Sequence, residues 1–276
     1  MGVLDGKVAF ITGAARGQGR SHAVRLAEEG ADIIAVDLCA QPETVSTPGS
    51  TPEDLAETVA QVEALDRRIV SSIADIRDQA RLADVATEGV AELGRLDIVL
   101  ANAAIWALPE REPEGIEERV KVWKETVDIN LTGQWNTLEA TVPILIEQGQ
   151  GGAIVITSST AALKSMSINS LQQTAYTAAK HGVIGLMRNY AVELAPHSIR
   201  VNTVAPTGVE TPMIQNELVE RYLEGHPELL DLMANALPVP AVEPRDISNG
   251  ILYLVSDAGR YVTGTTLPVD AGFLVR

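Results

Sequence analysis

The chain alternates between short runs of apolar residues and longer segments in which apolar residues recur with helical spacing. Each short run is apolar throughout, as expected for parallel strands covered by helices on both faces. We therefore predict strands at residues 7–12, 32–37, 68–73, 97–101, 153–158, 199–205 and 266–269. We predict the intervening helices at residues 17–29, 52–65, 77–93, 123–148, 174–195 and 244–255. This order predicts an α/β fold, a doubly wound parallel sheet in a single domain over residues 1–276.

Two segments interrupt this alternation. Residues 38–51 are rich in Pro, Ser and Thr and separate the second strand from its helix, where connections usually have about two to six residues. Residues 207–240 mix Pro and Gly with short apolar helical pieces, and they follow the carboxyl end of a strand, where ligands bind in open α/β sheets. We expect the first segment to be an insertion and the second to be a substrate loop or lid.

Composition and charge limit the cellular location and the classes of partner that we expect for this protein. The net charge of −16 argues against nucleic acid and anionic membranes as partners, because both require clustered Lys and Arg. No apolar run reaches the roughly 18 residues that span a bilayer, and the first residues lack a signal-peptide layout, so we expect a cytoplasmic protein. Cys39 is the single cysteine and the four histidines are scattered, so no disulfide and no metal site is predicted.

The first predicted strand runs directly into a glycine-rich turn. Gly13, Gly17 and Gly19 have the spacing G-x-x-x-G-x-G, which only approximates the general dinucleotide pattern G-x-G-x-x-G. Such a turn lets backbone N–H groups and a helix N-terminus approach a pyrophosphate. The alternative is a tight turn that serves only close helix packing.

Asp37 ends the second strand, at the position where an acid accepts hydrogen bonds from the adenosine ribose. A carboxylate there repels a 2′-phosphate and favours NAD over NADP, although it could also be an ordinary strand-end acid. Arg16 is a contrary cue because it could pair with that phosphate, but we expect Asp37 to prevail. Asp75 follows the third strand and lies either near the adenine or at the cap of the helix that begins near Arg77.

Tyr176 and Lys180 are four residues apart and therefore share one face of the predicted helix at residues 174–195. A phenol has a pKa of about 10, which is too high for an efficient base at neutral pH. A neighbouring ammonium lowers that pKa, so that the phenol can exchange a proton with an alcohol or carbonyl oxygen. The same spacing occurs in ordinary surface helices, so it indicates catalysis only in combination with the other motifs of the chain.

Further motifs follow one another in a fixed order. They are TGAARGQG at residues 12–19, Asp37, Asp75-Ile76, Asn102-Ala103-Ala104, Asn130, Ser158-Ser159, Tyr176-x-x-x-Lys180 and APTG at residues 205–208. Over nearly the whole chain they resemble the short-chain dehydrogenase/reductase family, which implies a Rossmann-type fold and NAD. The catalytic tetrad that the resemblance implies is Asn130, Ser159, Tyr176 and Lys180. The predicted cofactor-binding residues are Gly13, Arg16, Gly17, Gln18, Gly19, Asp37, Leu38, Asp75, Ile76, Asn102, Ala103, Tyr176, Lys180, Pro206, Val209 and Thr211.

The family resemblance implies a role for each residue of the tetrad. Ser159 would hydrogen-bond the substrate oxygen, and Tyr176 would exchange the substrate's proton. Lys180 would bind the nicotinamide ribose and lower the pKa of Tyr176, while Asn130 would hold a water that links Lys180 to solvent.

Three features depart from the family pattern. Extra residues within 163–173 lengthen the interval that precedes the tyrosine, which leaves Ser158 as an alternative to Ser159. Ala104 stands where the family has Gly and adds only a methyl group. Thr207 separates a proline and a glycine that are adjacent in the family, which could shift the loop that meets the nicotinamide carboxamide.

Residues 17–23, GQGRSHA, together with the insertion are similar to one subfamily, the mycofactocin-associated, carveol dehydrogenase-like oxidoreductases. This similarity implies that NAD is tightly retained beneath the insertion, and that an external mycofactocin-like redox carrier reoxidises it in place. A cover of this kind slows the exit of a ligand. The family also implies a homotetramer, with the predicted helices at residues 123–148 and 174–195 in an interface. We expect His22 to be a helix-surface or packing residue.

Apolar residues indicate the class of substrate. The residues that could line an apolar pocket, unless they form helix-packing stripes, are Trp106, Leu163, Met213, Ile214, Leu218, Tyr222, Leu223, Leu229, Leu230 and Met233. We expect a hydrophobic secondary alcohol and its ketone. Two other hypotheses stay open: an NADPH-dependent carbonyl or 3-oxoacyl-thioester reductase, and a non-catalytic NAD-binding sensor.

Overall fold

Seven parallel strands form one sheet in the computed structural model, which describes residues 2–106, 111–165 and 170–276. The strands are β1 (Val8–Thr12), β2 (Asp32–Asp37), β3 (Ile69–Ile73), β4 (Ile98–Ala101), β5 (Gly152–Thr157), β6 (Ile199–Pro206) and β7 (Thr266–Val269). Their order in the sheet is β3-β2-β1-β4-β5-β6-β7, so the winding reverses between β1 and β4. A switch point of this kind opens a crevice at the carboxyl ends of the strands. The predicted doubly wound fold is confirmed.

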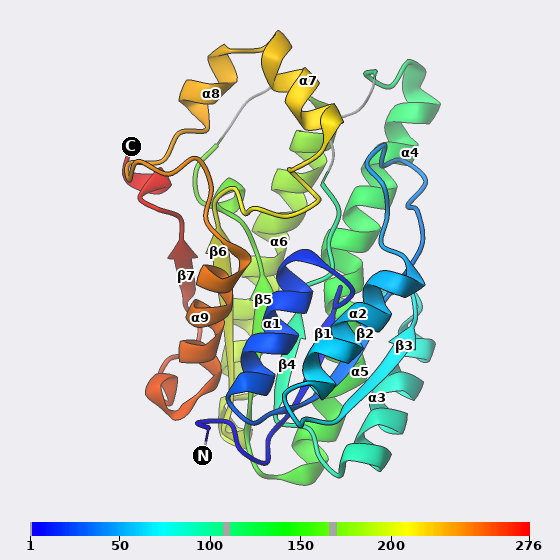
Figure 1. The fold of residues 1–276 in the computed structure, drawn as a ribbon, viewed down its shortest axis with the longest axis vertical. Helices are drawn as coiled ribbons and strands as arrows, with labels where there is room; N and C mark the ends of the chain where they lie inside the picture. Colours follow the sequence, from blue (N-terminus) through cyan, green and yellow to red (C-terminus); the bar gives the residue numbers. More distant parts are fainter. Residues whose placement is uncertain (1, 107–110, 166–169) are drawn as a thin grey trace.

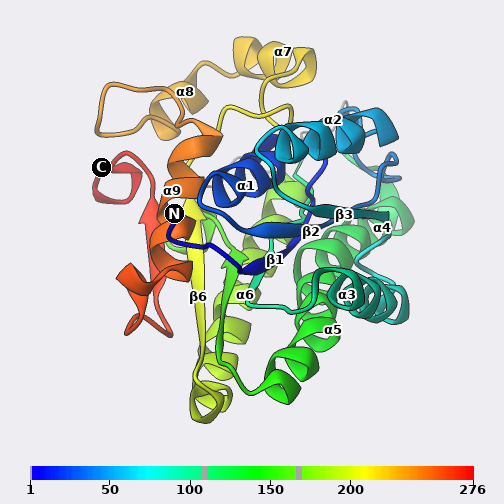
Figure 2. The same ribbon diagram turned by 60° about the horizontal axis from the view of Figure 1, so that its bottom comes forward.

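Helices cover both faces of the sheet (Figures 1 and 2). One layer consists of α1 (Gly17–Glu28), α2 (Pro52–Glu63) and α9 (Pro244–Val255). The other consists of α3 (Gln79–Leu93), α4 (Gly115–Val127), α5 (Gly133–Gln148) and α6 (Leu171–Glu193). Two short helices, α7 (Glu217–Gly225) and α8 (Glu228–Leu232), lie at the carboxyl-end side of the sheet. Within the described ranges, no helix combines the length and the apolar character needed to cross a membrane.

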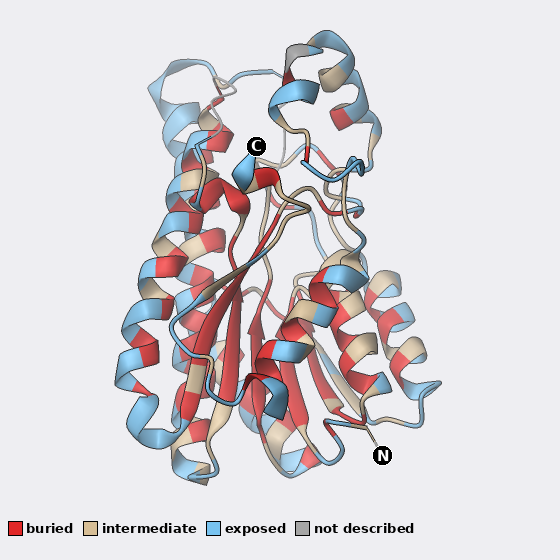
Figure 3. Cartoon of the chain, turned by 90° about the vertical axis from the view of Figure 1, so that its left-hand side faces the viewer, coloured by how far each residue is buried: buried red, intermediate tan, exposed pale blue. Residues whose placement is uncertain are grey.

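The inner strands β1, β2, β4, β5 and β6 are buried because each contributes apolar side chains to both layers, whereas the edge strands β3 and β7 are partly exposed (Figure 3). In β1, Val8 and Phe10 join the core cluster on the α3, α5 and α6 side. Ala9 and Ile11 point the other way and join the cluster beneath α1 and α9. This alternation between two buried faces explains why the strand sequences are apolar throughout.

Some helix boundaries differ from the predicted ones. The helix predicted at residues 123–148 begins earlier, with α4, and a π-helical turn over Asp128–Thr132 joins α4 to α5. Turns of this kind are often found at functional sites. The helix predicted from residue 77 begins at Gln79, because the side chain of Asp78 caps it by accepting a hydrogen bond from the Arg81 N–H at 3.0 Å. The helix predicted from residue 174 begins at Leu171.

Candidate functional site

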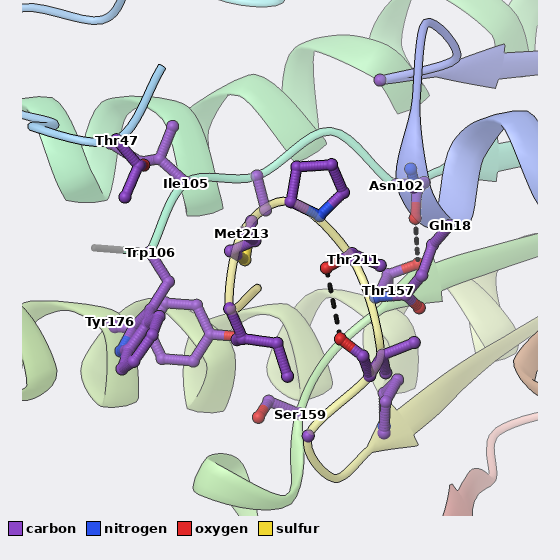
Figure 4. Close-up of a pocket in the computed structure, with 18 of the residues that line it drawn as sticks. Gln18, Thr47, Asn102, Ile105, Trp106, Thr157, Ser159, Tyr176, Thr211 and Met213 are labelled. Atoms are coloured by element: carbon purple, nitrogen blue, oxygen red, sulfur yellow. Dashed lines mark hydrogen bonds between the residues drawn. The ribbon is translucent and has the colours of Figure 1, made fainter. Parts of the chain in front are cut away.

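A cavity of about 810 Å³ lies at the carboxyl ends of the strands, and residues of the predicted lid, 207–240, form part of its wall. The insertion at residues 38–51 also contributes to the wall. All predicted site residues except Asn130 line this cavity; they are Gly13, Arg16, Gly17, Gln18, Gly19, Asp37, Leu38, Asp75, Ile76, Asn102, Ala103, Ser159, Tyr176, Lys180, Pro206, Val209 and Thr211. The fold therefore brings these separate motifs to one place (Figure 4).

The glycine turn forms one end of the cavity. Gly13 and Gly17 have positive φ angles of 69° and 55°, and a Cβ on Gly13 would lie 2.8 Å from the Cα of Ala103. A Cβ on Gly19 would lie 1.9 Å from the carbonyl oxygen of Gly13, so Gly19 serves close packing. Arg16, the N-cap of α1, makes no side-chain cap hydrogen bond, which leaves the first N–H groups of the helix for an anion.

Asp37 is held at the end of β2 by hydrogen bonds from both sides. Its carboxylate accepts from the Ala15 N–H at 2.9 Å, from the Cys39 N–H at 3.1 Å and from the Ser50 hydroxyl at 2.5 Å. The turn and the insertion thus meet at this carboxylate. The Arg16 guanidinium donates to the Pro48 carbonyl of the insertion at 2.6 Å, so this contact already engages it. This weakens the argument that Arg16 pairs with the 2′-phosphate of NADP.

Asp75 does not cap α3, since Asp78 holds that position. The carboxylate of Asp75 accepts from the Arg77 N–H at 2.8 Å and lies 2.6 Å from the Arg77 guanidinium. Partial burial opposes ionisation of Asp75, but the contacts with Arg77 hold the pKa of this carboxyl below its ordinary value. Asp75 lines the cavity, and its place near the adenine stays a prediction.

The insertion is fastened to α4 by Glu125, a buried carboxylate that is 7 % exposed. Glu125 accepts hydrogen bonds from the N–H of Glu43 at 3.0 Å, the N–H of Thr44 at 2.6 Å and the Thr44 hydroxyl at 2.5 Å. A second contact joins Lys121 and Glu43 at 2.8 Å. Together with the contact between Ser50 and Asp37, these bonds attach the insertion at its middle and near its carboxyl end.

Tyr176 and Lys180 line the cavity from α6, and Figure 4 shows Tyr176 there. The Lys180 Nζ lies 5.6 Å from the centroid of the Tyr176 ring and donates to the Thr157 carbonyl at 2.7 Å. Lys180 is 1 % exposed, and this burial lowers its pKa to about 7. Burial raises the pKa of the Tyr176 phenol, while the Ser159 hydroxyl acts in the opposite direction. Each group alone therefore resists becoming charged.

The two adjacent serines have different surroundings. The Ser158 hydroxyl is buried and donates to the Lys180 carbonyl at 3.0 Å, which ties β5 to α6. The Ser159 hydroxyl accepts from the Ala161 N–H at 3.1 Å and keeps its own proton for another acceptor. This geometry favours Ser159 over Ser158. Of the extra residues within 163–173, residues 166–169 lie outside the described ranges.

Asn130 lies in the π-helical turn and is fully buried. Its side-chain amide donates to the Ile105 carbonyl at 2.7 Å and accepts from the Ile105 N–H at 2.8 Å. The side chain thus fixes Ile105, which lines the cavity, while Asn130 itself does not. Its role in holding a water near Lys180 stays a prediction.

The other end of the cavity is apolar. Of the predicted pocket residues, those that line it are Trp106, Met213, Ile214, Leu223, Leu230 and Met233, whereas Leu163, Leu218, Tyr222 and Leu229 do not. Leu163 is 42 % exposed instead. The Trp106 indole N–H donates to the Gln173 side-chain oxygen at 3.0 Å, which fixes the ring beside Tyr176 (Figure 4).

Sequence reasoning missed three residues that shape or support the site, namely Gln173, Glu125 and Phe273. Gln173 precedes Tyr176 by one helical turn, a spacing that could have revealed it. Glu125 stands between the buried residues of α4, but its partners are more than 80 residues away in the chain. Phe273 lines the cavity and had no signal in its local sequence.

His22, which we expected to be a helix-surface or packing residue, is a packing residue. It is fully buried, with its Nδ1 2.8 Å from the Ser248 hydroxyl, and this burial lowers its pKa to about 3.

A glycine turn for a dinucleotide and a Tyr-x-x-x-Lys helix that meet in one cavity define an oxidoreductase of the short-chain dehydrogenase class. A family model described as enoyl-(acyl carrier protein) reductase matches residues 13–274. The chain belongs to the short-chain dehydrogenase/reductase family, as the sequence predicted.

Relatives of known structure or activity agree with this membership. The crystal structure of carveol dehydrogenase from Mycobacterium avium in complex with NAD is 51% identical, with a TM-score of 0.93 over 100% of both chains. The (-)-trans-carveol dehydrogenase of Rhodococcus erythropolis is 47% identical over 99% of each chain. A 3-oxoacyl-[acyl-carrier-protein] reductase of Thermotoga maritima is 32% identical, again over 99% of each chain. The resemblance to carveol dehydrogenases is thereby confirmed.

Proposed function

We propose that this protein is an NAD(H)-dependent dehydrogenase that interconverts a hydrophobic secondary alcohol and its ketone. The observation that carries the proposal is the meeting of Ser159, Tyr176 and Lys180 in the same cavity as the glycine turn and Asp37. This arrangement offers a dinucleotide cradle at one end, proton-transfer groups in the middle and an apolar wall at the other end. The solved carveol dehydrogenase with NAD supports the choice of cofactor.

The residues at the glycine turn fit NAD. Gly13 and Gly17 allow the positive φ angles of the tight turn, and the N-terminus of α1 that follows would receive the pyrophosphate. Asp37 would bind the adenosine ribose, with Leu38, Asp75 and Ile76 beside the adenine. Nearer the reaction centre, the residues that would hold the nicotinamide half are Asn102, Ala103, Lys180, Pro206, Val209 and Thr211. When bound, NAD supplies a nicotinamide carbon that accepts or returns a hydride.

Tyr176 would act as the acid and base for the substrate oxygen. In alcohol oxidation, the O–H proton of the alcohol passes to the Tyr176 oxygen while the Ser159 hydroxyl holds the substrate oxygen. To accept this proton, Tyr176 must first be a phenolate, and a charged Lys180 would stabilise that phenolate. Since burial brings the pKa of Lys180 to about 7, this lysine can also take up or release a proton near neutral pH.

The charge distribution supports an uncharged substrate. Among the described residues that line the cavity, the charged ones are Arg16, Asp37, Asp75 and Lys180. Arg16 is bound to the insertion, and the two acids lie at the cofactor end. The wall formed by the lid offers no cation to a carboxylate, a phosphate or the carrier of an acyl thioester. We therefore place an alcohol of the carveol type ahead of an acyl-thioester substrate.

We further propose that NAD is retained through turnover and is reoxidised in place by an external carrier of the mycofactocin type. The support is the attachment of the insertion through Glu125 and Asp37 next to the adenosine end of the cavity. Desalting the purified protein tests retention directly, because a retained nucleotide stays with the protein and is detected by mass spectrometry. Recovery of nucleotide-free protein after one desalting step would contradict it.

We also propose a homotetramer, as the family resemblance implies. Exposed apolar side chains on α4, α5 and α6 support it, among them Trp123, Trp135 and Val192. Light scattering coupled to size-exclusion chromatography would show a mass four times 29.4 kDa. A monomer at micromolar concentration would contradict it.

One experiment tests the proposed reaction. The protein is assayed with a panel of cyclic secondary alcohols, with NAD or NADP, and with and without an artificial electron acceptor. We expect oxidation of apolar alcohols with NAD, and turnover that depends on the acceptor if NAD is retained. Faster reduction of a 3-oxoacyl thioester with NADPH would favour the reductase hypothesis. Binding of NAD without turnover of any alcohol or ketone would favour the sensor.

A further inference from the structure

Phe273 closes the lid end of the cavity, although it lies far from every other residue of the site in the sequence. It is 1 % exposed and contributes to the same cavity wall as Tyr176 and Ser159. It begins a short 3-10 turn, Phe273–Val275, that follows β7. The segment just before Phe273 is bound to the lid, since the Ala271 carbonyl accepts a hydrogen bond from the Leu237 N–H at 2.9 Å. Leu237 also lines the cavity.

Lys164 holds Phe273 in two ways. The Lys164 Nζ lies 4.6 Å from the centroid of the Phe273 ring, a cation–π distance, and donates to the Phe273 carbonyl at 3.1 Å. Lys164 follows Ser159 by five residues, and its own N–H donates to the Thr160 carbonyl at 2.9 Å. The position of the ring is therefore linked to the loop that carries the serine of the site.

The end of this segment is bound to α8. The Arg276 guanidinium lies 2.6 Å from the Asp231 carboxylate, and the Arg276 carbonyl accepts from the Lys164 Nζ at 2.8 Å. The turn itself is closed by Asp270, whose carboxylate accepts from the Leu274 N–H at 2.9 Å. The segment from Asp270 to Arg276 thus connects the lid to the serine loop and places one aromatic ring in the cavity.

We propose that Phe273 is a specificity-determining residue that limits the size of the alcohol substituent pointing toward the lid, and that Lys164 is its positioning residue. This inference rests on the proposed function and adds to it the residue that limits the size of the substrate. A buried aromatic ring excludes bulk by contact and contributes no hydrogen bond, so it selects by shape among apolar substrates. The two carbonyls hold the Lys164 ammonium in place, so the ring can swing aside only by giving up its cation–π contact with this fixed charge.

The test compares a small and a bulky substrate in wild type and in the variants F273A, F273L and K164M. The substrates are cyclohexanol and 4-tert-butylcyclohexanol, and the measured quantity is the ratio of their kcat/KM values. We expect F273A to shift the ratio about tenfold toward the bulky alcohol, and F273L and K164M to shift it about threefold in the same direction. The matched control is V275A, because Val275 lies in the same turn but is 85 % exposed, and we expect no shift.

A binding measurement separates this inference from the proposed reaction. Calorimetry of cyclohexanone and 4-tert-butylcyclohexanone with the protein and NAD, an oxidised pair that cannot react, gives a ratio of Kd values that does not require turnover. If wild type oxidises neither alcohol but F273A shifts the ratio of Kd values, the proposed reaction fails and the inference stands. An equal loss for both ligands in F273A, a shift as large in V275A, or no binding of either ketone to wild type would overturn the inference.

Discussion

The two ends of the cavity are built in opposite ways. The cofactor end is formed by short segments at the ends of neighbouring strands, with carboxylates and main-chain N–H groups held by the sheet, as at Ala15 and Asp37. The lid end is assembled from distant segments that contribute Trp106, Met213 and Phe273 to the cavity wall, and none of the described lid residues that line the cavity is charged. The first end can recognise a charged, invariant ligand, and the second can vary its shape without disturbing the first.

This difference predicts which property a substitution will change. Substitutions at the cofactor end should alter the choice and retention of the dinucleotide, and those at the lid end should alter the choice of alcohol. Tyr176 and Lys180 lie between the two ends and should control the reaction itself.

The largest effect is expected at Tyr176. Y176F removes the proton that the phenol exchanges and keeps the ring, so we expect kcat to fall about 10³-fold while the Kd for NAD stays within about twofold. Steady-state kinetics and calorimetry measure the two quantities. Tyr253→Phe is the control, since Tyr253 lies on α9 and does not line the cavity. Retention of a tenth or more of the wild-type kcat in Y176F would remove Tyr176 from its proposed role.

The next largest effect should occur at Asp37. D37N keeps the shape of the side chain but removes the charge that would repel a 2′-phosphate, so we expect the preference for NAD over NADP to fall about tenfold. Fluorescence titration of both nucleotides gives the ratio of their Kd values. Asp32→Asn, at the opposite end of the same strand, should leave the ratio unchanged. An unchanged ratio in D37N would mean that another group excludes NADP.

The sequence predicted the cofactor end well because its signals are local. The helical spacing of Tyr176 and Lys180 and the strand-end position of Asp37 survive errors of a few residues in the element boundaries. Boundary errors did hide another residue: the predicted helix at residues 174–195 excluded Gln173, which lies on α6 three residues before Tyr176. Phe273 could not be predicted, because its partner Lys164 lies 109 residues away and only tertiary packing brings them together.

A moderate effect is expected where the insertion is fastened. E125A removes the acceptor for two N–H groups and one hydroxyl of the insertion, so we expect the rate of NAD release to rise about tenfold with little change in kcat for bound cofactor. Stopped-flow exchange against a fluorescent NAD analogue measures the release. Glu117→Ala, on the exposed side of the same helix, is the control. Equal release rates in E125A and wild type would show that the insertion does not govern retention.

The smallest effect is a dependence of stability on pH that comes from Lys180. Burial lowers its pKa to about 7 in the folded protein, whereas the unfolded chain has the ordinary lysine value of about 10.4. Between these values the unfolded state binds more protons, so the contribution of Lys180 to the free energy of unfolding rises with pH, by at most about 1.4 kcal/mol per pH unit. Below pH 7 both states are protonated and the contribution is constant.

K180M removes this titration, so the difference in unfolding free energy between wild type and K180M should increase from pH 7 to pH 9. Urea unfolding of nucleotide-free protein measures it, and Lys124→Met, at an exposed position of α4, should give a difference that does not change with pH. The pH dependence of this difference separates two descriptions of the surroundings of Lys180. A rising difference means that the folded protein keeps Lys180 dry and ready to release its proton beside Tyr176. A constant difference means that Lys180 keeps an ordinary pKa and stays charged over this range, so that it stabilises the phenolate as an ammonium and does not release its proton.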